Sequence, residues 1–212
     1  MTEFRGARGS NTGDDFHELW ATRQAIRLLL NEDGLEALAV EGLAALDEAK
    51  SNEDTWDGVD CTLYFSGRNA RKASQVVLQQ LKYSAATPEA AWTIARLAGG
   101  TRRDRSVIAR LAKAWKGVME LRQGGSAPGV VLISNQPVDS EVTSAFARAA
   151  AVPVRCPTRR PGSSAAVESR LAYASGLSTE DFHAFCKAIR FEAGTGSRFA
   201  LEEQVLGAIA DW

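Results

Sequence analysis

The stretch GVDCTLYF, residues 58–65, alternates apolar and polar side chains as a half-buried strand does. A second run of the same kind, VVLQQLKY, occupies residues 76–83. Side chains on a strand point alternately to its two faces, so Gln80 and Lys82 share one face of the second run. If the two runs are neighbouring strands, they bring the carboxylate of Asp60 close to an amide oxygen and an ammonium group.

These three side chains suit phosphodiester hydrolysis with a divalent metal. Carboxylate and amide oxygens, here those of Asp60 and Gln80, are hard ligands for Mg²⁺ or Mn²⁺. Lys82 can orient the attacking water or stabilise charge on the scissile phosphate. A bound metal would polarise the phosphate and lower the pKa of its water, an effect of several kcal/mol. Glu41, in the run before Asp60, and Glu18, on the first predicted helix, are further candidate acids.

Taken singly, each of these residues has an ordinary structural explanation. Asp60 can close a turn after Gly58, and Gln80 and Lys82 can be solvated side chains of a strand. The two glutamates can likewise point to solvent. The combination of residue types on two adjacent strands is what indicates a site.

Charge is distributed unevenly along a chain that is close to neutral overall. The 212 residues carry a formal net charge of −1, and 45% are hydrophobic, which is ordinary for one α/β domain. Residues 32–60 contain ten acidic side chains against Lys50, and residues 96–122 contain eight basic ones against Asp104 and Glu120. This pattern is typical of a metal site beside a surface for a phosphate backbone. Two solvated faces of opposite sign would give the same pattern.

Six basic residues are the candidates for nucleic-acid contacts, and they are Lys72, Arg102, Arg103, Arg105, Lys113 and Lys116. They would hold phosphates without reading sequence. Arg159 and Arg160 either extend this surface or keep a Pro-rich loop soluble. No segment reads as a base-reading helix-turn-helix, so we expect little sequence specificity.

Several other classes of function find no support. The three cysteines are widely spaced and form no CxxC or Cys/His cluster, which argues against zinc and indicates free thiols in a reducing cytoplasm. There is no P-loop motif and no GxSxG elbow. His17 is expected on a helix surface or in the core, with a place near Asp60 as the alternative. No apolar run predicts a signal peptide or a membrane span, so we expect a cytoplasmic protein without membrane contact.

Periodicity predicts an alternating α/β order. After a flexible lead-in at residues 1–12, the expected strands lie at 35–43, 58–65, 76–83 and 129–134, and the expected helices at 14–31, 88–98, 104–123 and 140–151. The remainder, including 201–212, reads as short helices. Residues 13–212 are therefore expected to form one domain, with a core at about 13–152 and a helical extension at about 163–212. We expect it to be the N-terminal module of a longer protein.

Four segments resemble one known family. GDDFHELW at 13–20, LAVEG at 38–42, DGVDCTLYF at 57–65 and VVLQQLKYS at 76–84 are similar to PD-(D/E)xK nuclease domains. These are the double-stranded-DNA endonuclease domains of bacterial anti-phage proteins, such as CBASS effectors and Avs-type STAND NTPases. The resemblance implies a restriction-endonuclease-like α/β core, with a central mixed sheet flanked by helices, followed by C-terminal helices.

The resemblance also implies roles for individual residues. Asp60 matches the metal-binding Asp of the family, and Gln80 and Lys82 match its (D/E/Q)xK pair. Glu18 matches the acid on the first helix, and Glu41 is an extra acid and possible third metal ligand. The family more commonly has Glu where this chain has Gln80. A neutral amide donates less electron density than a carboxylate, so metal affinity is expected to be lower.

By this resemblance the chain is a Mg²⁺- or Mn²⁺-dependent endonuclease that cuts double-stranded DNA as the output of an anti-phage system. A sensor or ATPase domain, on the same or a partner chain, would restrain it until it clusters into a homo-oligomer. Two alternatives stay open. Gln80 favours a non-catalytic nuclease-fold module that binds nucleic acid or partner subunits, and an RNA-directed nuclease would use the same residues.

Overall fold

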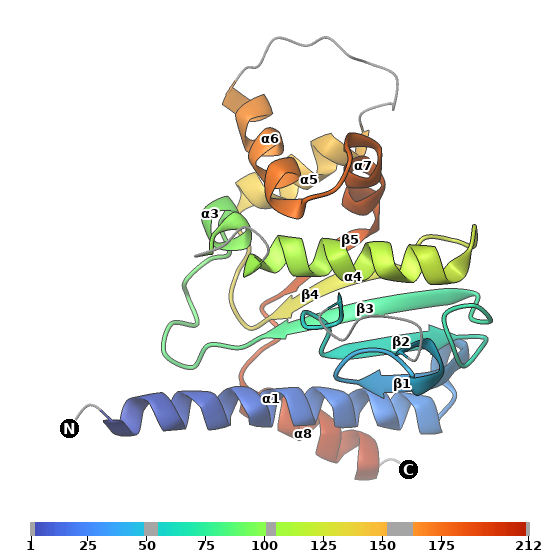
Figure 1. Cartoon of the computed structure of the whole chain (residues 1–212). Helices are drawn as coiled ribbons and strands as arrows, with labels where there is room; N and C mark the ends of the chain where they lie inside the picture. Colours follow the sequence, from blue (N-terminus) through green and yellow to red (C-terminus); the bar gives the residue numbers. More distant parts are fainter. Residues whose placement is uncertain (1–2, 49–54, 101–104, 152–162, 211–212) are drawn as a thin grey trace.

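A five-stranded mixed sheet forms the centre of the computed structural model, which describes residues 3–48, 55–100, 105–151 and 163–210 (Figure 1). The strands lie side by side in the order of the chain: β1 (Leu35–Val40), β2 (Cys61–Phe65), β3 (Gln75–Lys82), β4 (Gly129–Ser134) and β5 (Ile189–Ala193). The first three are antiparallel, and β3, β4 and β5 are parallel. The predicted α/β fold with a mixed central sheet is confirmed.

Helices cover both faces of this sheet (Figure 1). They are α1 (Glu3–Leu29), α2 (Ala45–Glu48), α3 (Ile94–Ala98), α4 (Val107–Arg122), α5 (Ser140–Ala151), α6 (Ser163–Ser175), α7 (Thr179–Ala188) and α8 (Arg198–Ala210), with a 3₁₀ turn η1 at Glu32–Gly34. Helix α4 lies along one face, and α1 lies along the other and packs against α8. Helices α5, α6 and α7 form a further layer beyond α4. Among the described helices, none is long and apolar enough to cross a membrane.

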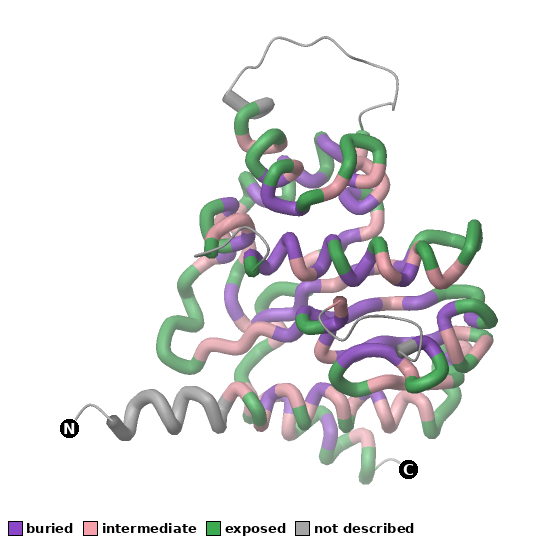
Figure 2. The backbone as a smooth tube through the Cα atoms, viewed as in Figure 1, coloured by how far each residue is buried: buried purple, intermediate pink, exposed green. Residues whose placement is uncertain are grey.

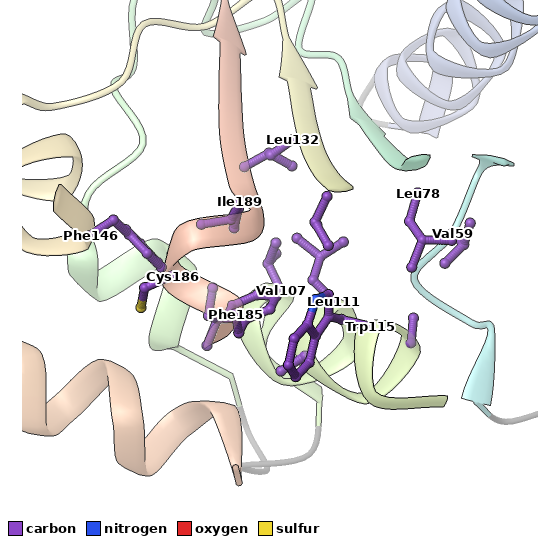
Figure 3. Close-up of a cluster of buried hydrophobic side chains, with 14 of the residues drawn as sticks. Val59, Leu78, Val107, Leu111, Trp115, Leu132, Phe146, Phe185, Cys186 and Ile189 are labelled. Atoms are coloured by element: carbon purple, nitrogen blue, oxygen red, sulfur yellow. The ribbon is translucent and has the colours of Figure 1, made fainter. Parts of the chain in front are cut away.

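Each face of the sheet has its own core, as the alternation along β3 requires. Val76 and Leu78 belong to the large cluster on the α4 side, part of which Figure 3 shows. Leu81 belongs to a smaller cluster on the opposite face, which comprises Phe16, Trp20, Cys61, Leu81, Ile133 and Leu201. Figure 2 shows buried residues along the strands of the sheet and on the helices that pack on it. Gln80 and Lys82, two and four residues after Leu78, therefore face α4.

The observed elements depart from the predicted ones in two helices. Helix α1 begins at Glu3 rather than at residue 14, and residues 3–12 continue the same helix. The helix predicted at 88–98 begins only at Ile94, with Thr93 as its N-cap. Residues 88 and 89 form a turn, and Trp92 forms a parallel bridge with Val138, which keeps it out of a helix.

Strand β5 was not predicted, since the C-terminal part of the sequence reads as short helices. The residues IRFEA are too few to give a strong periodic signal, and they follow α7 directly. Pairing with β4 makes them a strand, and Phe191 then packs against Phe146 of α5, with ring centroids 5.2 Å apart. Ser178 is the N-cap of α7, and its side chain accepts a hydrogen bond from the Asp181 N–H.

Candidate functional site

Asp60 lies directly before β2 and is fixed to β3 by two hydrogen bonds. Its backbone N–H donates to the Gln79 carbonyl at 2.9 Å. Its Oδ2 accepts from the Leu81 N–H at 2.6 Å. The carboxylate is therefore held beside the end of β3, between Gln80 and Lys82 along the backbone. It stays accessible, with 26% of the side chain exposed.

Lys82 is the last residue of β3, and its ammonium group lies near this carboxylate. Burial lowers the pKa of Lys82, and the positive charge of Arg110 lowers it further. The carboxylates of Asp60 and Asp57 act in the opposite direction. A lysine whose pKa is lowered by desolvation exchanges its proton more readily than a surface lysine does. The predicted proximity of Asp60 and Lys82 is consistent with this electrostatic coupling.

Gln80 is buried, with 1% of the residue exposed, and its Oε1 has no hydrogen-bond partner among the described residues. Leaving a buried polar atom unsatisfied costs about 1–3 kcal/mol. An amide oxygen that accepts no hydrogen bond has lone pairs free for a hard cation. The predicted ligand role of Gln80 stays a prediction, because its side chain is closed off from solvent and no hydrogen bond among the described residues joins it to Asp60.

A polar hollow of about 620 Å³ opens on the α1 side of Asp60. Its lining comprises Asp14, His17, Glu18, Ala21, Thr22, Val40, Glu41, Asp60, Cys61 and Leu81. The structure thus brings Glu18 and Glu41 to the same hollow as Asp60. Gln80 and Lys82 are not part of this lining, because their side chains point to the α4 face of the sheet. Asp60 is the residue that joins the two groups.

The backbone holds Glu41 next to Asp60. The Glu41 N–H donates to the Asp60 carbonyl at 2.8 Å. Glu41 has φ of +57°, in the left-handed region that non-glycine residues seldom adopt. Gly42 follows, and its N–H donates to the Val59 carbonyl at 2.9 Å. Strained residues of this kind cluster at functional sites, which favours a role for the exposed Glu41 carboxylate.

Two buried aromatic residues position Glu18 and its neighbour His17. Phe16 and Trp20 are buried on the sheet, and Trp20 Nε1 donates to Gln79 Oε1 at 2.9 Å. His17 and Glu18 lie between these anchors and reach the hollow. His17 Nδ1 is 3.9 Å from Asp60 Oδ1. His17 is a surface residue of α1, as expected, with 38% of its side chain exposed, and the position of α1 on the sheet also brings it near Asp60.

Carboxylates alone do not form a metal cage. Within the described ranges, no three His, Cys, Asp or Glu side chains are grouped so that they could hold a metal ion. A cation at Asp60 would therefore need a donor of another kind, such as an amide oxygen.

The predicted basic surface is not gathered around Asp60. Arg102 and Arg103 lie outside the described residues, and Arg105 and Lys72 are exposed. Lys113 and Lys116 line a different hollow, of about 460 Å³, between α4 and the end of α6. Lys116 Nζ also lies 3.3 Å from Asp181 Oδ2 of α7.

Within the described ranges, Arg110 of α4 also reaches the site, and the sequence analysis did not single it out. Its side chain lies against the loop that precedes Asp60. It belongs to the basic run at 96–122, and its position three residues before Lys113 gave no reason to prefer it. The contact with the loop depends on how α4 packs on the sheet.

Thiol reactivity can test the electrostatics of this region. Burial, together with the charge of Asp60, raises the pKa of Cys61 to about 12, and burial with Glu168 raises that of Cys186 to about 12. In a Cys156→Ser variant, we expect neither thiol to react quickly with a disulfide reagent at pH 8. Both should react after denaturation. Rapid labelling of the native variant would contradict the burial of Cys61 and Cys186.

No protein-family model matches the sequence, and no curated protein matches it significantly. The functional assignment therefore depends on the chemistry around Asp60. That chemistry combines an oriented carboxylate, a buried amide oxygen without a donor and a partly desolvated lysine.

Proposed function

We propose that this protein is a metal-dependent endonuclease with a restriction-endonuclease-like core of the PD-(D/E)xK type. One observation carries the proposal. The Asp60 carboxylate is oriented by the Leu81 N–H, on the strand that also carries Lys82 and the unpaired Oε1 of Gln80. A mixed central sheet flanked by helices supports it.

The residues present fit a hard divalent cation, Mg²⁺ or Mn²⁺. Asp60 would hold it, with Gln80 as the second ligand on the α4 side of the sheet or with Glu41 and Glu18 as the further ligands in the hollow on the α1 side. When bound, such an ion polarises a phosphate oxygen and lowers the pKa of a water molecule. Leu81 fixes one carboxylate oxygen of Asp60, so the orientation of that group is set before substrate arrives.

Lys82 would act on the substrate side of this pair. Its amine can hold the attacking water or donate to a non-bridging phosphate oxygen as charge develops. The pKa of Lys82 is lowered by burial, so the group can also exchange a proton with that water. The neighbouring Asp60 carboxylate opposes this lowering of the pKa.

The biological role that follows is the output of an anti-phage system acting on double-stranded DNA in the cytoplasm. Little sequence specificity is proposed, so cutting would need control by a sensor or ATPase domain and by assembly into a homo-oligomer. Indiscriminate cleavage would otherwise damage the host.

Supercoiled plasmid provides the test. With Mg²⁺ or Mn²⁺ we expect conversion to nicked and then linear DNA, and EDTA should stop the reaction until excess metal is added. No conversion under any condition, or conversion unaffected by EDTA, would contradict the proposal. A matched double-stranded RNA in parallel tests for an RNA-directed nuclease, which would cut the RNA and leave the plasmid intact.

A non-catalytic nuclease-fold module is the second candidate, and Gln80 favours it. PD-(D/E)xK nucleases more commonly have a carboxylate at this position, and this chain has the neutral amide of Gln80. The acidic residues that the structure describes also form no group of three that could hold a metal ion. Such a module would retard duplex DNA in a gel without cutting it in Mg²⁺ or Mn²⁺. Metal-dependent cleavage by the wild type would exclude it.

A further inference from the structure

Arg110 has hydrogen-bond donors that the folded chain does not use. Its Nε is buried and has no partner among the described residues. Its Nη1 lies 3.9 Å from Asp57 Oδ2, beyond hydrogen-bond distance, and 75% of the Asp57 side chain is exposed. A long pair with a solvated carboxylate contributes little. The guanidinium group has five N–H donors, and these contacts do not satisfy them.

Arg122, near the end of the same helix, shows what a structural arginine looks like in this protein. Its Nε donates to the Ser126 carbonyl at 2.7 Å, and its Nη1 and Nη2 donate to the carbonyls of Ala70 and Ser74. All three nitrogen atoms of Arg122 therefore tie loops to α4. Arg110 makes no comparable set of contacts with the described residues, and a structural role of that kind does not explain its position.

The fold presses Arg110 against the loop that ends at Asp60. A Cβ added to Gly58 would lie 2.7 Å from Arg110 Cβ, so glycine allows this close approach. Helix α4 is held on the sheet by Ile108 and Leu111, both fully buried, on either side of Arg110. The rigid helix α4 thus positions Arg110. The residue that Arg110 contacts, Gly58, lies two positions before Asp60 in the chain.

The charges around this point would favour an anion once Asp60 holds a cation. Lys82 and Arg110 lie close enough that Arg110 helps to lower the pKa of Lys82. Asp57 and Asp60 are the acids that act on the same lysine. If Asp60 binds a divalent cation, its negative charge no longer balances Lys82 and Arg110, and the site gains net positive charge. A phosphate diester would supply the balancing negative charge and accept hydrogen bonds from the guanidinium fork.

We infer that Arg110 binds a backbone phosphate of duplex DNA beside the Asp60–Lys82 pair. This inference rests on the proposed function, and it assigns to α4 one specific substrate contact. The contact contributes to substrate binding. Removing it should therefore lower the affinity for DNA and raise KM, while kcat changes little. Hydrogen bonds to charged groups contribute about 1.5–3 kcal/mol, which corresponds to a loss of about 10- to 100-fold in affinity.

The experiment compares wild type with Arg110→Met, Arg110→Lys and a control, Arg148→Met. Arg148 pairs with Glu168 at 2.8 Å, between α5 and α6. Affinity for a labelled duplex is measured by fluorescence anisotropy in Ca²⁺ across a salt series, and KM and kcat are measured in Mg²⁺. We expect Arg110→Met to weaken binding by about 10- to 100-fold and to lower the salt slope by about one. Arg110→Lys should recover part of the affinity, and the control should match wild type.

The outcomes separate this inference from the proposed function. If wild type binds duplex but does not cut it, the proposed function fails and the anisotropy series alone decides the role of Arg110. If wild type cuts and Arg110→Met keeps the same affinity, KM and salt slope, the inference is overturned. Loss of binding in Arg110→Met with a lowered melting temperature and no recovery in Arg110→Lys would also overturn it, since a structural role then explains the result.

Discussion

Lys82→Met is expected to slow plasmid cleavage by about 10²- to 10³-fold, the usual effect of removing one oriented group that stabilises developing charge. Methionine keeps the length and apolar stem of lysine but has no amine to hold water or phosphate. The variant should still bind duplex DNA, because Arg110 and the surface lysines remain. The loss should therefore appear in kcat.

The same substitution should leave the protein at least as stable as wild type. Burial lowers the pKa of Lys82, so in the folded state the ammonium is disfavoured. Between the lowered pKa and 10.5, the unfolded chain binds the proton more tightly, and wild-type stability rises with pH through that window. At pH values below the lowered pKa, Lys82 is charged in both states, and the full free-energy cost of burying its ammonium group destabilises the wild type. The advantage of Lys82→Met should therefore be largest at low pH and shrink as pH approaches 10.5.

Single-turnover cleavage and thermal melts at two pH values check both expectations. Lys187→Met, an equivalent change on α7, is the control and should behave as wild type in both measurements. Equal cleavage by wild type and Lys82→Met would remove Lys82 from the site. A variant that loses activity together with several degrees of melting temperature at pH 6 would point to a structural lysine.

Gln80→Met is expected to lose most cleavage while becoming more stable. Methionine has nearly the same volume as glutamine but has no oxygen to bind a cation. It also removes the unpaired buried Oε1, whose desolvation costs about 1–3 kcal/mol. A substitution that stabilises the fold and abolishes the reaction is the signature of a residue kept for function.

Gln80→Glu gives the complementary result. A carboxylate at the buried position 80 should destabilise the metal-free protein, because burial disfavours its charged form. Saturating Mn²⁺ should reverse this, since a ligand at 100 times its Kd stabilises the folded state by about 2.7 kcal/mol. Thermal melts in EDTA and in Mn²⁺ measure the difference. If Mn²⁺ leaves the melting temperature of Gln80→Glu unchanged, position 80 is not a metal ligand.

Local sequence patterns predicted the part of the fold that carries the site. Strands β2, β3 and β4 have strong alternation or an apolar run, and β4 and α5 begin and end where expected. Strand pairing then follows from the short connection between β2 and β3. The proximity of Asp60 to β3 was therefore accessible from the sequence.

The remaining features depend on tertiary packing. Strand β5 exists because β4 offers an edge, and the five residues IRFEA carry little signal alone. His17 reaches Asp60 because Phe16 and Trp20 set the rotation of α1 on the sheet. The face of α4 that meets the 57–59 loop selects Arg110, while Lys113 and Lys116 turn toward α6 and α7. Helical periodicity separates the faces but does not say what each one contacts.

Binding of Mn²⁺ to the protein, followed by the electron paramagnetic resonance of free Mn²⁺, tests the proposed cation site without any substrate. Asn at position 60 can still accept the Leu81 N–H, so Asp60→Asn should fold normally. We predict that wild type binds Mn²⁺ at least about tenfold more tightly than Asp60→Asn, with Asp14→Asn close to wild type. Equal affinity of wild type and Asp60→Asn would contradict the account.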